Sequence, residues 1–300
     1  MAYEPMKWIA RKPVGQLFLH LRSTRRHGSP HGFTLIEMLV VMGIIALLVG
    51  LLVPALKSVR TTGRMTTEMN SARQLYTAYS NYSTNNKELL LPGYKVGLSA
   101  RDQSGKSVSG IPAARYPWRI APFFGYHFEG MYTNENAELL EHMQQEDATT
   151  YQYLISVFPS LGLNSTWLGG DESDGGFDPT FEDVFGPYYL KRIGQAQHPE
   201  RLIVFGSARG NDPTGYLGQS TFDGYFRIRS PYLASARWVD HFNEADPPAD
   251  FGYVSPRYDG NAVTGFLDGH TGQLNQTQLK DMRHWADGAT KEDWVLTPRQ

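Results

Sequence analysis

The chain has 300 residues, and its 41% hydrophobic and 19% charged content is ordinary for a globular protein, which excludes bulk disorder. It contains no cysteine, so disulfides, thiolate metal sites and cysteine nucleophiles are excluded together. The net charge is −2, but residues 1–32 carry six Lys/Arg and one acid, which leaves −7 for the remainder. A basic N-terminal segment followed by an acidic remainder argues against a general nucleic-acid binder. It favours a protein whose two parts lie on opposite sides of a membrane.

Residues 38–56 form an apolar run of 19 residues without a charge. As a helix this run is about 28 Å long, enough to cross the hydrocarbon core of a bilayer. One alternative is a secretory signal, whose apolar region is usually about 7–15 residues and ends at a small-residue cleavage site. Another is a buried core helix, but such helices rarely lack all polar residues. The length of the run favours a membrane span, and the basic residues before it place the N-terminus in the cytoplasm.

An acidic residue, Glu37, stands directly before this run, in the sequence Gly-Phe-Thr-Leu-Ile-Glu at 32–37. A carboxylate near a span is costly and is usually functional, although it can also snorkel to the interface. The sequence, with Arg25 and Arg26 before it, resembles the processing site of type IV prepilins and type II secretion pseudopilins. The resemblance implies that a prepilin peptidase cleaves between Gly32 and Phe33 and N-methylates Phe33.

The same resemblance gives Glu37 a role in assembly. A lone carboxylate among packed helices is costly, and the amine at Phe33 of a neighbouring subunit can neutralise it and fix the axial register. The implied partners are the prepilin peptidase, other pilin or pseudopilin subunits, an inner-membrane assembly platform and membrane lipid, with no nucleic acid. The leader, residues 1–32, is longer than the family's short leaders, so Met6 is an alternative start.

The helix is expected to continue past the bilayer, because an apolar stripe at helical spacing follows the span. We predict one helix over residues 34–83, kinked at Pro54, which lacks a backbone donor and crowds the preceding turn. The predicted parts are a leader (1–32), a transmembrane and assembly helix (33–56), the outer half of that helix (57–85) and an extracytoplasmic α+β head (86–300). The stripe consists of Met65, Met69, Ala72, Tyr76 and Tyr79.

The head is expected to begin with a polar connector at 85–117, which is rich in Gly and Ser and reads as an exposed, mobile loop. Asp268-Gly269 lies between two apolar runs and predicts a hairpin whose two turn residues both have positive φ. The other predicted elements are helices at 136–145, 151–158 and 276–286, a buried strand at 201–205, and weaker strands at 222–228 and 237–242.

The acidic, Gly-rich stretch 169–183 is the candidate metal site. Asp171, Asp174 and Asp178, with backbone carbonyls, offer the oxygen ligands that calcium prefers, and some pseudopilins hold calcium in such a loop. The spacing is not that of an EF-hand. We therefore expect a solvated loop and no cofactor, with a calcium loop as the alternative.

The C-terminal half resembles prepilin-like proteins with a C-terminal H-x9-DG region, on the stretches 164–170, 194–205 and 258–270. Asp268 and Gly269 are present, but Tyr258 stands where the family has histidine. We therefore interpret the motif as a structural strand pair. The stretch 86–150 matches nothing that indicates its role.

No G-x-S-x-G, Walker A, G-x-G-x-x-G or H-E-x-x-H motif occurs, so no catalysis is expected. We predict an α+β, pilin-like fold, in which one long N-terminal helix packs on a small antiparallel sheet with large loops. The expected function is a pseudopilin or minor pilin of a type II secretion or type IV pilus-like filament. It is expected in the bacterial inner membrane as a single-pass protein, with its C-terminal domain periplasmic or extracellular. The alternative is a membrane-anchored extracytoplasmic enzyme or binding protein that uses a pilin-like leader.

Overall fold

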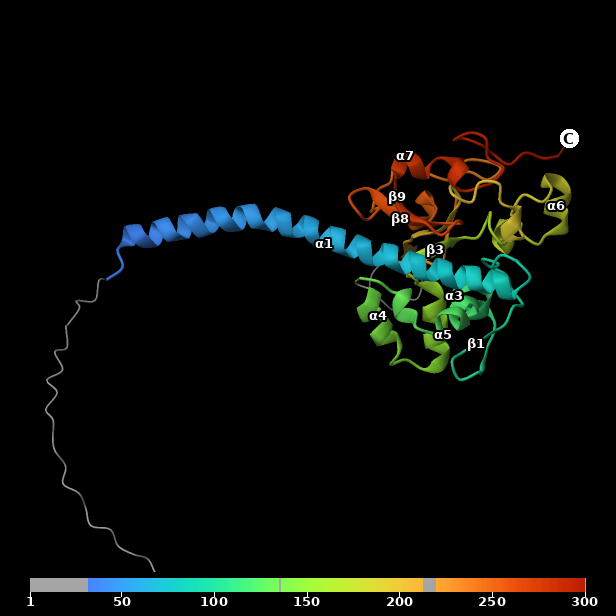
Figure 1. Cartoon of the computed structure of the whole chain (residues 1–300), viewed down its shortest axis with the longest axis horizontal. Helices are drawn as coiled ribbons and strands as arrows, with labels where there is room; N and C mark the ends of the chain where they lie inside the picture. The colour runs from blue at the N-terminus through green and yellow to red at the C-terminus, as the bar shows by residue number, and fades with distance from the viewer. Residues whose placement is uncertain (1–31, 135, 213–219, 300) are drawn as a thin grey trace, which may run out of the picture. The chain divides into compact units, whose positions relative to one another are not determined.

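The computed structural model describes residues 32–134, 136–212 and 220–299. Apart from Gly32, the predicted leader lies outside the described residues. The fold is α+β, as predicted, with one long N-terminal helix and a head built around a five-stranded sheet (Figure 1). Contacts divide the chain into two units between Val53 and Pro54.

Helix α1 spans Leu35–Asn85, close to the predicted range. Its first part is apolar and exposed throughout. It is the one helix in the described residues that is long and apolar enough to cross a membrane. Pro54 lies inside the helix, which continues through it. The kink at Pro54 stays a prediction.

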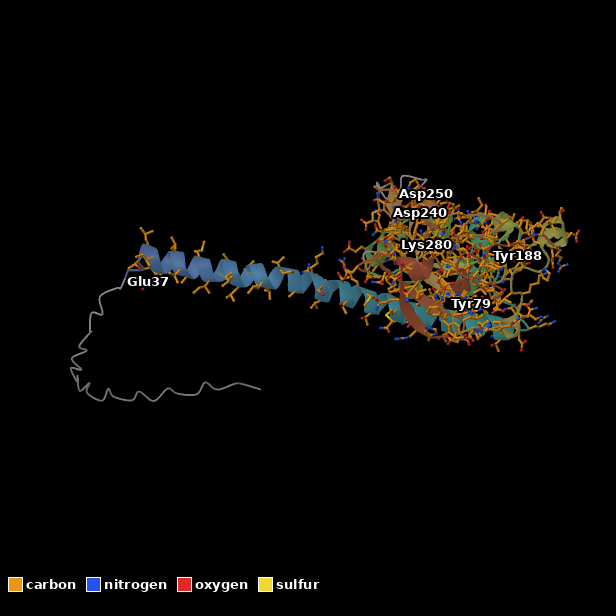
Figure 2. The ribbon with its side chains drawn as sticks, turned by 90° about the horizontal axis from the view of Figure 1, so that it is seen from above. Glu37, Tyr79, Tyr188, Asp240, Asp250 and Lys280 are labelled. Atoms are coloured by element: carbon orange, nitrogen blue, oxygen red, sulfur yellow. The ribbon has the colours of Figure 1, made fainter. Side chains whose placement is uncertain are left out.

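The outer part of α1 packs into the head through the predicted stripe. Ala72 and Tyr79 are fully buried, and the Tyr79 ring meets Phe205 edge-to-face with centroids 5.8 Å apart (Figure 2 labels Tyr79). Met65, Met69 and Tyr76 of the stripe are half-buried at its borders. The buried face also contains one charged residue, Glu68. The other buried residues of α1 are Ser71, Leu75, Ala78 and Ser83.

The central sheet has the strand order β7-β3-β4-β8-β9. Strands β3 (Leu161–Asn164) and β4 (Ile203–Ser207) are buried along their whole length, which agrees with the predicted buried strand. The sheet is mixed, because β7 (Arg227–Ile228) runs parallel to β3, whereas the other pairs are antiparallel. Two small antiparallel pairs flank it: β1 (Ala100–Arg101) with β2 (Ser107–Val108), and β5 (Gly210–Asn211) with β6 (Thr221–Phe222).

The predicted C-terminal hairpin is present as β8 (Asn261–Phe266) and β9 (Thr271–Asn275), but its turn differs from the prediction. Only Gly269 has a positive φ, of 96°, and its N–H donates to the Phe266 carbonyl. This is a three-residue loop with glycine in the left-handed position. A Cβ at Gly269 would also lie 2.6 Å from the Tyr76 ring of α1. Backbone conformation and close packing both require glycine there.

Four other predictions are wrong in whole or in part. The predicted strand at 222–228 is not continuous, because β6 ends at Phe222 and β7, in a different sheet, begins at Arg227. The connector contains the β1–β2 pair, and Leu91 and Val108 are fully buried, because these scattered apolar residues reach the main core. Residues 237–242 form no strand. The closing helix is short, since α7 (Gln276–Leu279) is followed by a separate 3-10 turn, Met282–His284.

The helices predicted at 136–145 and 151–158 are confirmed as α4 (Asn136–Met143) and α5 (Ala148–Val157). Asp147 caps α5 by accepting from the N–H groups of Thr149 and Thr150. The remaining helices are α2 (Ile111–Ala114), α3 (Tyr116–Ile120) and α6 (Pro179–Phe185), and the remaining 3-10 turns are Ala121–Phe124, Phe128–Gly130, Glu172–Asp174, Ile193–Gln195 and Pro248–Phe251.

Candidate functional site

The predicted cleavage position lies just before α1. Gly32, Phe33 and Thr34 are not helical, and the helix begins at Leu35. A reciprocal capping box fixes this start: the Glu37 carboxylate accepts from Thr34 N–H at 2.8 Å, and Thr34 Oγ1 accepts from Glu37 N–H at 3.2 Å. The Thr-x-x-Glu spacing is the sequence signature of such a cap. The Gly32–Phe33 peptide bond is therefore outside the helix.

The Glu37 carboxylate is only half satisfied by this cap. Both Thr34 donors, the backbone N–H and the hydroxyl at 2.9 Å, bind the same oxygen, Oε2. Among the described residues, Oε1 has no hydrogen-bond donor. Figure 2 shows Glu37 near the N-terminal end of α1. The geometry holds the carboxylate in place and leaves one oxygen for a donor from outside the chain.

The acidic stretch forms a buried ion-pair cluster with three arginines. The Asp171 side chain is fully buried, and its Oδ1 lies 3.3 Å from Arg227 Nη1. Asp174 Oδ1 lies 3.0 Å from Arg229 Nη2 and 3.1 Å from Arg237 Nη2. Burial alone would raise the pKa of Asp174, but Arg237 and Arg229 outweigh it and hold that pKa below its usual value. The pairing of Asp174 is thus intact at neutral pH and is lost only as the pH falls through this lowered pKa.

This arrangement differs from the solvated loop that the sequence predicts. Asp171 and Asp174 are buried because arginines distant in sequence supply the opposite charge. Asp178 is exposed and caps α6 by accepting from Thr180 N–H at 2.9 Å. Within the described residues, no group of three or more His, Asp and Glu side chains is placed to hold a metal ion. The three calcium candidates are not brought together as one ligand set.

We expect calcium to leave the melting temperature of the protein unchanged, because guanidinium groups already neutralise Asp171 and Asp174. Asp174→Asn should lower the free energy of unfolding by about 3 kcal/mol, since it leaves two half-buried arginines, Arg229 and Arg237, without their buried carboxylate partner. Thermal unfolding with calcium and with a chelator measures both effects. A calcium-dependent rise that Asp174→Ala abolishes would show a calcium loop instead.

A second buried charge cluster joins α1 to the sheet, and the sequence analysis missed it. The Glu68 side chain is fully buried, and its Oε2 accepts from Arg257 Nη2 at 2.7 Å and from the Tyr258 hydroxyl at 2.6 Å. The Ser207 hydroxyl of β4 donates to the other oxygen. Burial alone would lower the pKa of Arg257, but the Glu68 charge outweighs it and raises that pKa above its usual value. The cluster fixes α1 against the head at one position along the helix.

A signal for this cluster is present in the sequence. Glu68 lies three residues after Met65 and four before Ala72, so the helical period places a charge in the middle of the apolar stripe. A charge on a buried face requires a partner. The Tyr258 hydroxyl donates to Glu68, and Tyr258 stands where the family named in the sequence analysis has histidine.

The Asp268 side chain has a local role in the hairpin loop, where its Oδ1 accepts from His270 N–H at 3.1 Å.

Comparison with known proteins adds one finding. Residues 29–53 match the family model described as the prokaryotic N-terminal methylation motif, and this segment includes Gly32, Phe33 and Glu37. No curated protein and no solved structure matches the chain. The motif, together with the single long apolar helix and the α+β head, supports a type IV pilin-like protein that is anchored in the inner membrane and processed by a prepilin peptidase.

Proposed function

We propose that this chain is a structural subunit, a minor pilin or pseudopilin, of a type IV pilus-like or type II secretion filament. The observation that carries the proposal is the half-satisfied Glu37 carboxylate at the start of an uncovered apolar helix, inside the methylation motif. In a filament the free Oε1 accepts from the amine of Phe33 of a neighbouring subunit. In this pair the two charges neutralise each other, so neither is left unpaired in an apolar environment. The pairing also sets the axial register between neighbouring subunits.

The exposed apolar part of α1 suits two successive environments. Before assembly it lies in lipid, and after assembly it packs on the same helix of neighbouring subunits. The head, from about residue 57, lies on the extracytoplasmic side. We propose no catalysis and no resident cofactor. Its partners are the prepilin peptidase, other pilin-like subunits and the inner-membrane assembly platform, and its large head favours a minor or specialised subunit.

Mass analysis of the N-terminus tests the processing step. In a host with an active prepilin peptidase, the protein extracted from membranes should begin with N-methylated Phe33. In the same host without the peptidase, the leader should remain attached. A protein that keeps its leader although the peptidase is active and processes other prepilins contradicts the proposal.

A further inference from the structure

A cavity of about 490 Å³ lies in the head, beside the tip of the β1–β2 hairpin. This volume is within the usual range of small-molecule pockets, about 300–1,000 Å³. The filament function proposed above makes no use of it. The cavity is lined by Trp118, Tyr126, Phe128 and Tyr151 and by the hairpin residues Asp102, Gln103 and Ser104.

The aromatic part of the lining is rigid. Trp118 is 2% exposed, and its indole N–H donates to the Gln152 carbonyl at 2.8 Å. Its ring meets Phe128 and Tyr151 edge-to-face, with centroids 5.0 and 6.0 Å apart. An interlocked cluster of this kind loses little conformational entropy when a ligand packs on it.

Tyr126 has an unusual backbone conformation. Its φ is 61°, in the left-handed region that bulky residues rarely adopt. Two backbone hydrogen bonds hold it there: its N–H donates to the Ala121 carbonyl, and its carbonyl accepts from Phe128 N–H, each at 3.0 Å. Conformations of this kind are concentrated at binding and active sites. Here the strain positions an aromatic side chain in the cavity wall.

Three polar groups of the lining are neutral and available. The Tyr126 and Tyr151 hydroxyls and the Gln103 amide have no hydrogen-bond partner among the described residues. The lining contains one carboxylate, Asp102, whose Oδ1 already accepts from the Ser104 hydroxyl and from the N–H groups of Ser104 and Lys106. Because this carboxylate is engaged within the hairpin, the groups left for a ligand are the free hydroxyls and the amide, which offer a neutral, hydroxyl-rich ligand both donors and acceptors.

We propose that this cavity binds a neutral saccharide. A sugar ring has an apolar C–H face that packs on aromatic rings and a rim of hydroxyls that need hydrogen bonds. The half-buried rings of Tyr126 and Tyr151, held in place by the buried Trp118 and Phe128, supply the first. The hydroxyls of the two tyrosines and the Gln103 amide supply the second. The saccharide site is independent of Glu37 and of filament assembly.

Calorimetric titration and saturation-transfer NMR on the full-length protein test the proposal. The probes are glucose, galactose and N-acetylglucosamine with their β-linked disaccharides, and choline and a triproline peptide represent the other ligands of aromatic pockets. A polyoxyethylene detergent is required, because a maltoside detergent is itself a saccharide. We expect at least one of the sugars to bind, and neither choline nor the peptide.

Tyr126→Gly is the decisive variant. Glycine adopts the φ of this position without strain, so the variant should keep its melting temperature while losing the ring, and sugar binding should weaken by about tenfold or more. Gln103→Ala, at the exposed hairpin tip, should weaken binding less. Lys87→Gly is the matched control, since Lys87 also has a positive φ, of 56°, outside the cavity. Binding of choline or the peptide in place of sugars, no binding of any sugar, or equal binding by Tyr126→Gly would overturn the proposal.

Discussion

Glu37→Ala should leave processing and membrane insertion intact and should stop incorporation of the subunit into a filament. The uncharged helix inserts at least as easily as the native one. In the filament, however, the amine at Phe33 of each neighbour loses its partner, and an unpaired buried charge costs about 3 kcal/mol or more, which is over a hundredfold in affinity. The amount of subunit in sheared or crosslinked filaments measures this effect.

Glu37→Gln separates the capping role that the structure shows from the assembly role that we propose. Glutamine can replace glutamate in a capping box, so this variant keeps the helix start that Thr34 and Glu37 fix, but it removes the charge. If the charge pairs with a neighbouring amine, Glu37→Gln should fail to assemble, as Glu37→Ala does. Ile36→Ala is a control in the same turn of α1. Normal oligomer ladders for Glu37→Gln would mean that the charge of Glu37 is not needed for assembly and that the residue acts only as a helix cap.

Glu68→Gln should destabilise the head by about 3 kcal/mol, which corresponds to a drop of about 10 °C in melting temperature. The substitution leaves Arg257 buried, and the one opposite charge that remains beside it among the described residues is Asp223, with Oδ1 3.4 Å from Arg257 Nη1. Thermal unfolding of the full-length protein measures the loss. Glu141→Gln, an exposed change on α4, should alter stability by less than about 0.5 kcal/mol.

A double-mutant cycle shows whether Glu68 acts through Arg257. Glu68→Gln and Arg257→Gln should each be strongly destabilising, and the double variant should be less destabilised than the sum of the two, because the second change removes the charge that the first left unpaired. Additive losses would mean that Glu68 contributes through Ser207 and Tyr258 alone.

The N-terminal region was predictable from sequence because its determinants are local. Helix propensity, the length of the apolar run and the Thr-x-x-Glu spacing all act within a few turns of one helix. They gave the extent of α1 within two residues at either end, and they placed Gly32, Phe33 and Glu37 in a motif that the family model also matches. The apolar stripe of the outer helix followed from the 3.6-residue period in the same way.

The head depends on contacts between segments far apart in sequence, and there local signals were insufficient. From sequence alone, Asp171 and Asp174 predict a solvated or metal-binding loop. In the structure they are paired with arginines that lie more than 50 residues later in the chain. Glu68 meets Arg257 across 189 positions, and no local pattern identifies that partner. The Asp-Gly dipeptide predicts a turn at Gly269, but it does not reveal that Tyr76 of α1 packs against this glycine and donates its hydroxyl to the Leu267 carbonyl.

The sequence by itself thus determined the membrane helix, its start, the processing motif and the face of α1 that packs into the head. Only the tertiary structure decided which charges are buried, which partners neutralise them and where an aromatic cavity forms. The physical reason is that the cost of burying a charge depends on what lies within a few ångströms of it. In this head those neighbours come from strands and loops that the chain brings together only on folding.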